Sequence, residues 1–225
     1  MHMITRDYLE THYSNILLPN KNAILSGGVI DGNLINAAAD NRWSLVLLLR
    51  ISPDISDRIE ETIEELKVIE PNQYYYPKQD FHITVMDILK GELNQSIPEN
   101  IDSYRKCIED CVSKISPFSI EFDGLTASNG AVMVKGVYDE ELQCFREQLR
   151  KSFRESNLEL QERYETISSH ITIARFMNKL ENPKELLSYV EKEHYFGKMK
   201  VDSIEFAFHN WYDTRKKVLG EFTLP

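Results

Sequence analysis

Hydrophobic and polar positions alternate along residues 42–225 in a way that predicts both strands and helices. Apolar runs of strand length occur at 42–51, 81–89, 118–125, 130–137, 169–176, 201–209 and 217–224. Amphipathic helices are predicted between them, and these begin near Ser52, Pro98, Asp139 and Asn182. The resulting order is strand, helix, strand, helix, hairpin, helix, strand, helix, hairpin, which predicts an α+β domain.

The order of elements also divides into two similar halves. We therefore expect a bilobal fold in which two sheets, both rich in antiparallel pairs, face a central cleft and helices cover the outside. Residues 1–41 differ, because they are rich in asparagine and contain Gly27, Gly28 and Gly32. We expect this N-terminal extension to form short helices and loops. They would pack on a single domain formed by residues 42–225, where they could narrow access to the cleft.

Two of the predicted strands contain nearly the same residues, FHITV at 81–85 and SHITI at 169–173. Side chains alternate along a strand, so His82 and Thr84 share one face, and His170 and Thr172 do the same. The aliphatic neighbours then pack under the helices, and the polar pairs face the cleft. Threonine makes up only 9 of the 225 residues, so two such motifs arise by chance in well under about 1% of comparable chains.

This set of side chains suits the opening of a cyclic phosphodiester. The reaction needs a base to take a proton from water and an acid to protonate the departing ribose oxygen. Histidine suits both roles because its unperturbed pKa is about 6.5. Threonine hydroxyls can donate hydrogen bonds to the non-bridging oxygens. We predict His82, Thr84, His170 and Thr172 as catalytic residues, and the symmetry of the motifs leaves open which histidine is the base.

The paired motifs HITV and HITI resemble the signature of the 2H phosphoesterase superfamily, which includes LigT-like RNA 2′,3′-cyclic phosphodiesterases. The segments YYYPKQDFHITV and VDSIEFAFHNWYDT are similar to the family's approach to its first motif and to its closing hairpin. The resemblance covers about residues 42–225 and leaves the extension without a counterpart. It implies a bilobal α+β fold and the cleavage of cyclic phosphates or 2′,5′-phosphodiesters without a metal or another cofactor.

Four further residues are candidates for substrate binding. Tyr76 could stack on a base, and an ordinary aromatic position at the rim is the alternative. Lys135, Tyr212 and Arg215 could steer a phosphate, although basic residues at a hairpin tip are often simply solvated. His209 could approach the cleft from the closing hairpin, with a rim position as the alternative. The histidines outside the two motifs show no metal-binding spacing.

Composition narrows the class of ligand and the compartment. A net charge of −10 disfavours binding to duplex DNA, because neutralised phosphates supply most of such affinity. A small nucleotide or a short RNA end fits better. The sequence contains no run of 18 or more apolar residues, so we expect no membrane span. The three cysteines form no CxxC pair, which favours a reduced, cytoplasmic setting, and we expect a monomer.

The sequence therefore predicts a metal-independent phosphodiesterase that hydrolyses 2′,3′-cyclic phosphates or 2′,5′-linked (oligo)nucleotides by two-histidine acid–base catalysis. One alternative is an enzyme that processes RNA ends, either a trimming nuclease or a 2′-5′ RNA ligase. A non-catalytic nucleotide-binding module is the other. A binding module would not need two proton-transfer groups, which favours an enzyme.

Overall fold

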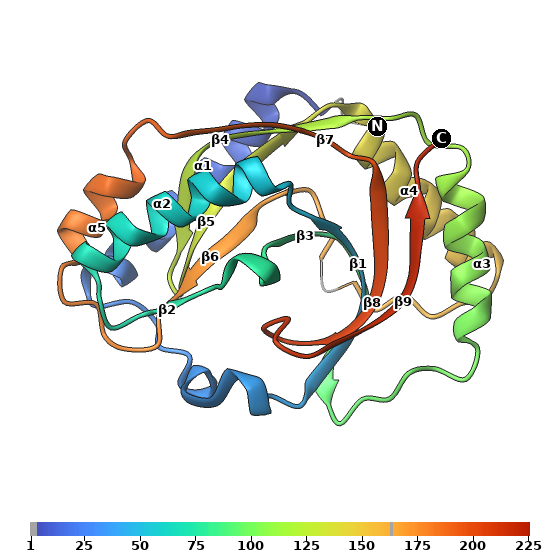
Figure 1. Ribbon diagram of the computed structural model, residues 1–225, viewed down its shortest axis with the longest axis horizontal. Coiled ribbons are helices and arrows are strands. Elements are labelled where there is room, and N and C mark those ends of the chain that lie inside the picture. Colours follow the sequence, from blue (N-terminus) through green and yellow to red (C-terminus); the bar gives the residue numbers. More distant parts are fainter. Residues whose placement is uncertain (1–3, 163) are drawn as a thin grey trace.

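The computed structural model describes residues 4–162 and 164–225 (Figure 1). The strands are β1 (Arg42–Arg50), β2 (Tyr74–Tyr75), β3 (His82–Leu93), β4 (Ser119–Ser128), β5 (Ala131–Tyr138), β6 (Ile171–Arg175), β7 (Tyr195–Lys200), β8 (Ser203–Asn210) and β9 (Lys216–Thr223). The α-helices are α1 (Arg6–Leu25), α2 (Pro53–Ile69), α3 (Ile101–Val112), α4 (Glu140–Glu155) and α5 (Pro183–Val190). Two 3-10 helices, η1 (Gly32–Ala39) and η2 (Lys78–Asp80), complete the described elements.

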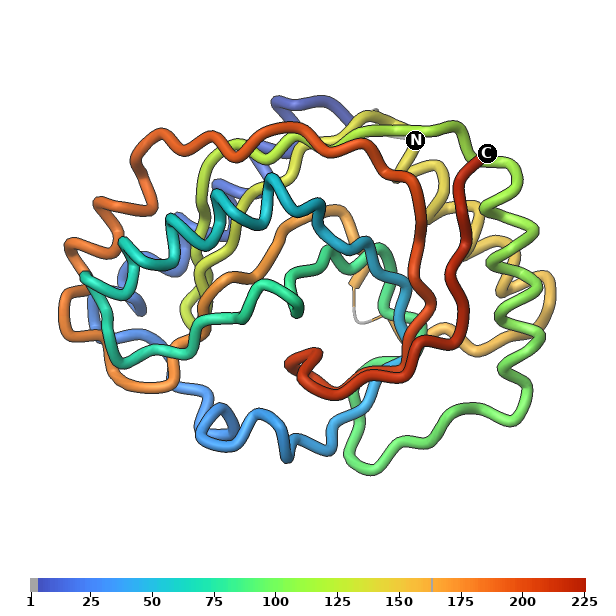
Figure 2. Tube along the Cα trace, viewed as in Figure 1, coloured from blue at the N-terminus to red at the C-terminus, as the bar shows by residue number. Residues whose placement is uncertain are grey.

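All nine strands belong to one antiparallel sheet, which curls around the centre of the molecule (Figure 2). The strand order is β7-β4-β5-β6-β3-β1-β8-β9, and β2 pairs with β6. The prediction of two separate sheets was therefore wrong. The two motif strands, β3 and β6, pair with each other through Ile83 and Ile171, and this contact joins the two halves into one sheet.

The helices cross from one half of the sheet to the other. Helix α2 follows β1 but packs on β6 and β7, and helix α4 follows β5 but packs on β3. Helices α1 and α5 cover β4, while α3 packs on α4 and β9. Buried apolar residues from both halves form one continuous cluster. The two halves therefore share one hydrophobic core.

Capping and periodicity explain where the helices lie. Helix α2 begins at Pro53, and α4 and α5 begin directly after Asp139 and Asn182, as the sequence predicted. Helix α3 begins at Ile101, three residues beyond the predicted proline. The buried face of α4 carries the apolar residues spaced three and four apart that predicted it, namely Leu142, Phe145, Leu149 and Phe153.

The N-terminal extension contains one long helix in addition to the short helix η1 and loops of the kind expected. Helix α1 runs for 20 residues after the capping residue Thr5 and packs on β4 and β5. Its apolar periodicity is weak, because Leu9, Tyr13 and Ile24 are its only buried residues. Polar residues interrupt the apolar stripe, which is why the sequence pattern did not predict a long helix.

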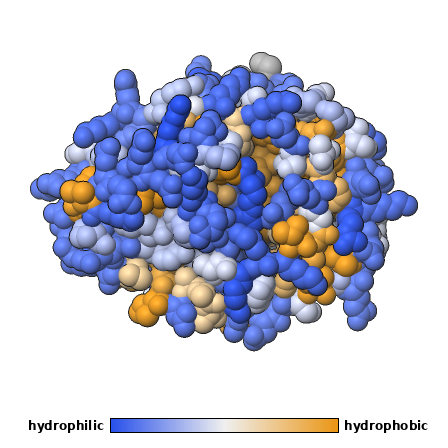
Figure 3. Space-filling view, viewed as in Figure 1, coloured by the Kyte–Doolittle hydropathy of each residue, from blue (hydrophilic) through white to orange (hydrophobic). Residues whose placement is uncertain are grey.

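Polar side chains cover most of the face shown in Figure 3. Within residues 4–162 and 164–225, no helix is both long and apolar enough to cross a membrane.

Candidate active site

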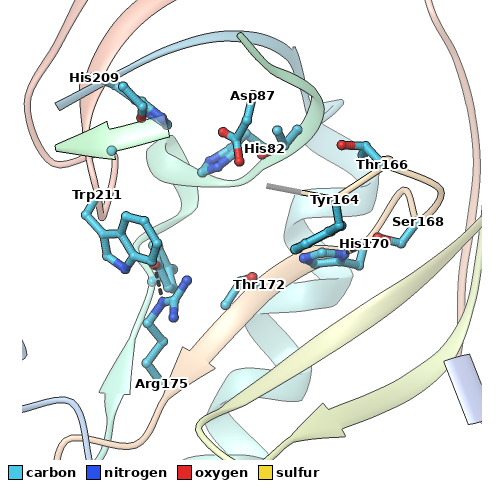
Figure 4. Close-up of a pocket in the computed structure, with 14 residues that line it drawn as sticks. His82, Asp87, Tyr164, Thr166, Ser168, His170, Thr172, Arg175, His209 and Trp211 are labelled. Carbon is cyan, nitrogen blue, oxygen red and sulfur yellow. Dashed lines mark hydrogen bonds between the residues drawn. The ribbon is translucent and has the colours of Figure 1, made fainter. Parts of the chain in front are cut away.

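The two motifs meet in one pocket, which has a volume of about 150 Å³ (Figure 4). The four predicted catalytic side chains all line it. The other described lining residues are Ser44, Tyr76, Asp87, Gly91, Tyr164, Thr166, Ser168, Arg175, His209 and Trp211. The pocket lies over the junction between β3 and β6, so the place where the two halves join also brings the two histidines together.

Strand alternation places the motif residues as the sequence predicted. Ile83 and Ile171 are fully buried under the helices, and so are the aliphatic residues two positions later in each strand. The histidine and threonine of each motif are only partly buried and line the pocket. The aliphatic residues stabilise the sheet, and the opposite face of the same strands presents the polar groups.

A β-bulge follows each motif and brings one more charged side chain into the pocket. The pairing of β3 with β1 skips Val85, and the pairing of β6 with β5 skips Ile173. One extra residue reverses the alternation beyond it. Asp87 and Arg175, each five positions after its motif histidine, therefore line the pocket instead of packing under the helices. Neither residue was predicted as a site residue from the sequence.

His82 is oriented by a backbone oxygen and lies near a carboxylate. Its Nδ1 lies 2.7 Å from the carbonyl oxygen of Asp80. Because a carbonyl only accepts hydrogen bonds, Nδ1 carries the proton and Nε2 is left for a ligand. The same Nδ1 lies 3.8 Å from Oδ2 of Asp213. Burial lowers the pKa of His82 to about 4, and the charge of Asp213 acts in the opposite direction.

Asp213 is a fully buried carboxylate in the turn between β8 and β9. It accepts hydrogen bonds from Nδ1 of His209 at 2.8 Å, Nη1 of Arg50 at 2.5 Å and Nζ of Lys216 at 2.9 Å. Burial alone would raise the pKa of Asp213, but the hydrogen bond from His209 and the nearby cationic groups lower it. A fixed negative charge therefore lies beside His82. Asp213 was not predicted as a site residue from the sequence.

His209 is a third imidazole of the pocket. Its ring is buried and lies edge-on to the ring of His82, with 5.8 Å between the centroids. It reaches the pocket from β8, as one of its two sequence interpretations allowed.

The surroundings of His170 have the opposite electrostatic character. Its Nδ1 lies 2.9 Å from Oγ of Ser168. Burial lowers the pKa of His170 to about 4, and the positive charge of Arg175 lowers it further. A charge on His82 also lowers the pKa of His170, so the two imidazoles interact across the pocket. The charge of Asp213 thus favours the protonated form of His82, whereas the charge of Arg175 favours the neutral form of His170.

Arg146 of helix α4 joins strand β3 to the segment that leads into β6. This fully buried residue of α4 donates to the carbonyl oxygens of Val85 at 2.8 Å, Ile167 at 2.9 Å and Ser168 at 2.8 Å. It also donates to the carbonyl oxygen of Thr84 at 3.4 Å and to the hydroxyl of Tyr138 at 3.0 Å. One guanidinium therefore binds the backbone of the first motif and of the residues that lead into the second, where few sheet hydrogen bonds join the two strands.

Tyr76 lies in the wall of the pocket, while Tyr212 lies behind it. The Tyr76 hydroxyl accepts a hydrogen bond from Nε of Arg175 at 2.8 Å, drawn as a dashed line in Figure 4. This contact fixes the guanidinium at the pocket edge. Tyr212 is fully buried, does not line the pocket, and donates to Oδ2 of Asp31 at 2.6 Å. Tyr212 therefore connects the extension to the hairpin tip.

The structure places Lys135 and Arg215 outside the pocket. Nζ of Lys135 lies 2.6 Å from a carboxylate oxygen of Glu10 in α1. Arg215 donates to the carbonyl oxygen of Asp40 at 2.5 Å, and its guanidinium lies 5.0 Å from the ring centroid of Trp43. These contacts give both residues structural partners. Binding of substrate by either residue stays a prediction.

The described residues contain no group of three or more histidine, cysteine, aspartate or glutamate side chains arranged to hold a metal ion.

Solved structures of other proteins have the same fold. TT0787 of Thermus thermophilus is 17% identical, with a TM-score of 0.63 over 80% of this chain and 97% of that chain. LigT of E. coli, in complex with NADP+, is 13% identical, with a TM-score of 0.56 over 81% of this chain and 98% of that chain. A conserved protein of unknown function from Agrobacterium tumefaciens is 14% identical, with a TM-score of 0.55 over 96% of this chain and 98% of that chain. At these identities the likeness establishes the fold.

Sequence comparison gives the family. No curated protein sequence matches the chain. The model of the 2'-5' RNA ligase superfamily matches residues 55–210, a segment that contains both His-x-Thr motifs, both bulges and His209. This segment is more than half of the 225 residues. The chain therefore belongs to the 2'-5' RNA ligase superfamily, the LigT-like group of 2H phosphoesterases.

Proposed function

We propose that the protein is a metal-independent phosphodiesterase that hydrolyses nucleoside 2′,3′-cyclic phosphates or 2′,5′-linked nucleotides. The observation that carries the proposal is the meeting of two imidazoles, two threonine hydroxyls and the guanidinium of Arg175 in one small pocket. Solved structures of E. coli LigT with 3'-AMP and ATP support a nucleotide as the ligand class.

The charges around the two histidines suggest a role for each. Asp213 favours a proton on His82, so His82 suits the general acid. Arg175 favours the neutral form of His170, so His170 suits the general base. This difference in surroundings supports one assignment where the symmetric motifs favour neither.

The reaction follows from these roles. His170 takes a proton from a water molecule as the water oxygen attacks phosphorus. The bond between phosphorus and the ribose oxygen breaks on the opposite side, and His82 gives its proton to that oxygen. Thr84 and Thr172 donate hydrogen bonds to the non-bridging oxygens, and Arg175 balances their negative charge. The products are a phosphomonoester and a free ribose hydroxyl, and proton exchange with solvent restores both histidines.

The test is hydrolysis of adenosine 2′,3′-cyclic phosphate and of a 2′,5′-linked diadenosine, with products separated by chromatography. We expect turnover by the wild type and its loss in His82→Ala and His170→Ala. His194→Ala is the matched control, because His194 lies outside the pocket and contacts the carbonyl oxygen of Tyr189 at 2.9 Å. Binding of both compounds without turnover would instead indicate a non-catalytic nucleotide-binding module.

The family name provides the observation that favours a second candidate, the joining reaction. In that direction a ribose 5′-hydroxyl would replace water as the group that His170 deprotonates. An RNA with a 2′,3′-cyclic phosphate end, incubated with a second RNA that carries a 5′-hydroxyl, distinguishes the two directions. A longer product with a 2′,5′ linkage would show ligation.

A further inference from the structure

The two motifs carry opposite charges at equivalent positions. Asp87 follows His82 by five residues, and Arg175 follows His170 by five residues. Each lies just beyond a β-bulge and lines the same pocket. Of the described residues that line the pocket, Asp87 is the carboxylate and Arg175 is the permanently charged cation. A pocket with this polarity binds an asymmetric ligand in one direction.

The proposed reaction places the nucleoside of the substrate on the Asp87 side. Water attacks from the side of His170, and the leaving oxygen departs on the side of His82. The leaving oxygen remains part of the nucleoside, so the nucleoside lies next to His82. Figure 4 shows the Asp87 carboxylate beside the His82 ring, and Tyr164 beside His170 on the other side. Asp87 is therefore the charged residue placed to face the nucleoside.

An aromatic side chain of the pocket offers a further contact for a nucleoside. Trp211 lines the pocket and has the guanidinium of Arg42 at 4.7 Å from its ring centroid. Its edge contacts Gly91, where an added Cβ would lie 3.0 Å from the indole ring. Asp87 interacts with the protein, but a carboxylate has about four acceptor positions and can bind a ligand donor as well.

We propose that Asp87 selects the nucleoside half of the substrate. It accepts a hydrogen bond from a hydroxyl or amino group there and repels a second phosphate. Among small nucleotides the pocket thus favours those whose reacting phosphodiester is their only negative charge. This inference rests on the proposed function, because it uses the direction of attack between the two histidines.

The experiment compares adenosine 2′,3′-cyclic phosphate with the same compound carrying a 5′-phosphate. In the wild type we expect kcat/KM to favour the 5′-hydroxyl compound by about tenfold or more, as a like charge at close range implies. Asp87→Asn removes the charge and keeps the shape, and it should reduce this preference at least about fivefold. Glu92→Gln is the control, since Glu92 is an exposed acid of the same strand outside the pocket.

Asp87→Ser provides a second variant if the asparagine variant folds poorly by circular dichroism. An unchanged preference in the Asp87 variants, or an equal change in Glu92→Gln, would overturn the inference. Affinities of both compounds, measured by calorimetry on His170→Ala, give the same comparison without turnover. A wild type that hydrolyses neither compound contradicts the proposed function, while the calorimetric ratio still decides the role of Asp87.

Discussion

The hydroxyl oxygen of Tyr13 lies 3.1 Å from the backbone nitrogen of Ser169, so helix α1 contacts the residue that precedes His170. The same hydroxyl donates to the carbonyl oxygen of Gly136 at 2.8 Å and accepts from its N–H at 3.2 Å. Gly136 has no room for a side chain, because an added Cβ would lie 2.1 Å from the Ser169 carbonyl oxygen. The extension therefore supports the backbone that leads into the second motif.

Tyr13→Phe should lower both stability and turnover. The change removes the oxygen that accepts from the buried N–H groups of Gly136 and Ser169, which costs about 1–3 kcal/mol of unfolding free energy. The carbonyl oxygen of Gly136 keeps the hydroxyl of Ser169 as a donor. A small displacement of His170 should reduce kcat about tenfold with a smaller effect on KM. Urea denaturation and steady-state kinetics measure the two effects. Tyr8→Phe, a change in a partly buried tyrosine of the same helix, is the control. Wild-type values for both quantities in Tyr13→Phe would show that the contact is dispensable.

Single alanine substitutions of the two histidines should lower kcat by roughly 10²–10⁴, the usual contribution of a positioned acid or base. The double variant should be little worse than either single one, because the two groups act together in one step. Thr84→Ala and Thr172→Ala should each cost about 1–3 kcal/mol of transition-state stabilisation, because each removes one hydrogen bond to a charged group. Full activity in either folded histidine variant would disprove the assignment.

The pH dependence of activity should differ between kcat/KM and kcat. Catalysis requires one neutral and one protonated histidine, so each quantity should give a bell-shaped profile. The pKa values of His82 and His170 are both about 4. The fraction of enzyme with one protonated and one neutral histidine therefore falls as the pH rises above these values. The kcat/KM optimum should then lie below about pH 6. A bound phosphodiester raises both pKa values, because its negative charge favours the protonated imidazoles, and it moves the kcat optimum to higher pH.

Rate measurements from pH 4 to pH 9 test this order of the two optima. A rate that climbs steadily with pH would point to hydroxide as the nucleophile instead.

Excess EDTA should leave hydrolysis unchanged. Imidazoles move the protons, and hydroxyls and a guanidinium hold the phosphate, so no step of the proposed mechanism requires a metal ion. The measurement is the rate before and after chelation, with a gel-filtered sample as the control. Loss of activity that zinc or manganese restores would contradict the mechanism.

The four motif residues could be predicted from the sequence because strand alternation is a local rule. His82 and Thr84 share a face whenever their segment is a strand, whatever it packs against. Asp87 and Arg175 break that rule, since a bulge depends on how a neighbouring strand pairs. The repeat itself contained a signal, because HITVMD and HITIAR carry a charged residue at the same distance from the histidine.

Asp213 and the single sheet depend on contacts between distant segments. Asp213 reaches His82 only because β8 and β9 bring their turn to the pocket, and no local pattern records that contact. The aliphatic positions of β3 and β6 predicted burial but not that Ile83 and Ile171 pair with each other. Helix α1 was not predicted because polar residues interrupt its apolar stripe. Contacts with distant segments, such as those of the Tyr13 hydroxyl with Gly136 and Ser169, hold it on the sheet.

The buried guanidinium of Arg146 also affects how the molecule attracts a ligand. Its five hydrogen-bond acceptors are four carbonyl oxygens and one tyrosine hydroxyl, so none of them cancels its charge. That charge lowers the pKa of His170, which shows that its field reaches the pocket. The whole protein carries a net charge of −10, so an approaching anion meets repulsion from the exterior and attraction from the pocket floor. Such a field admits a compact anion more easily than a polymer whose charges remain outside.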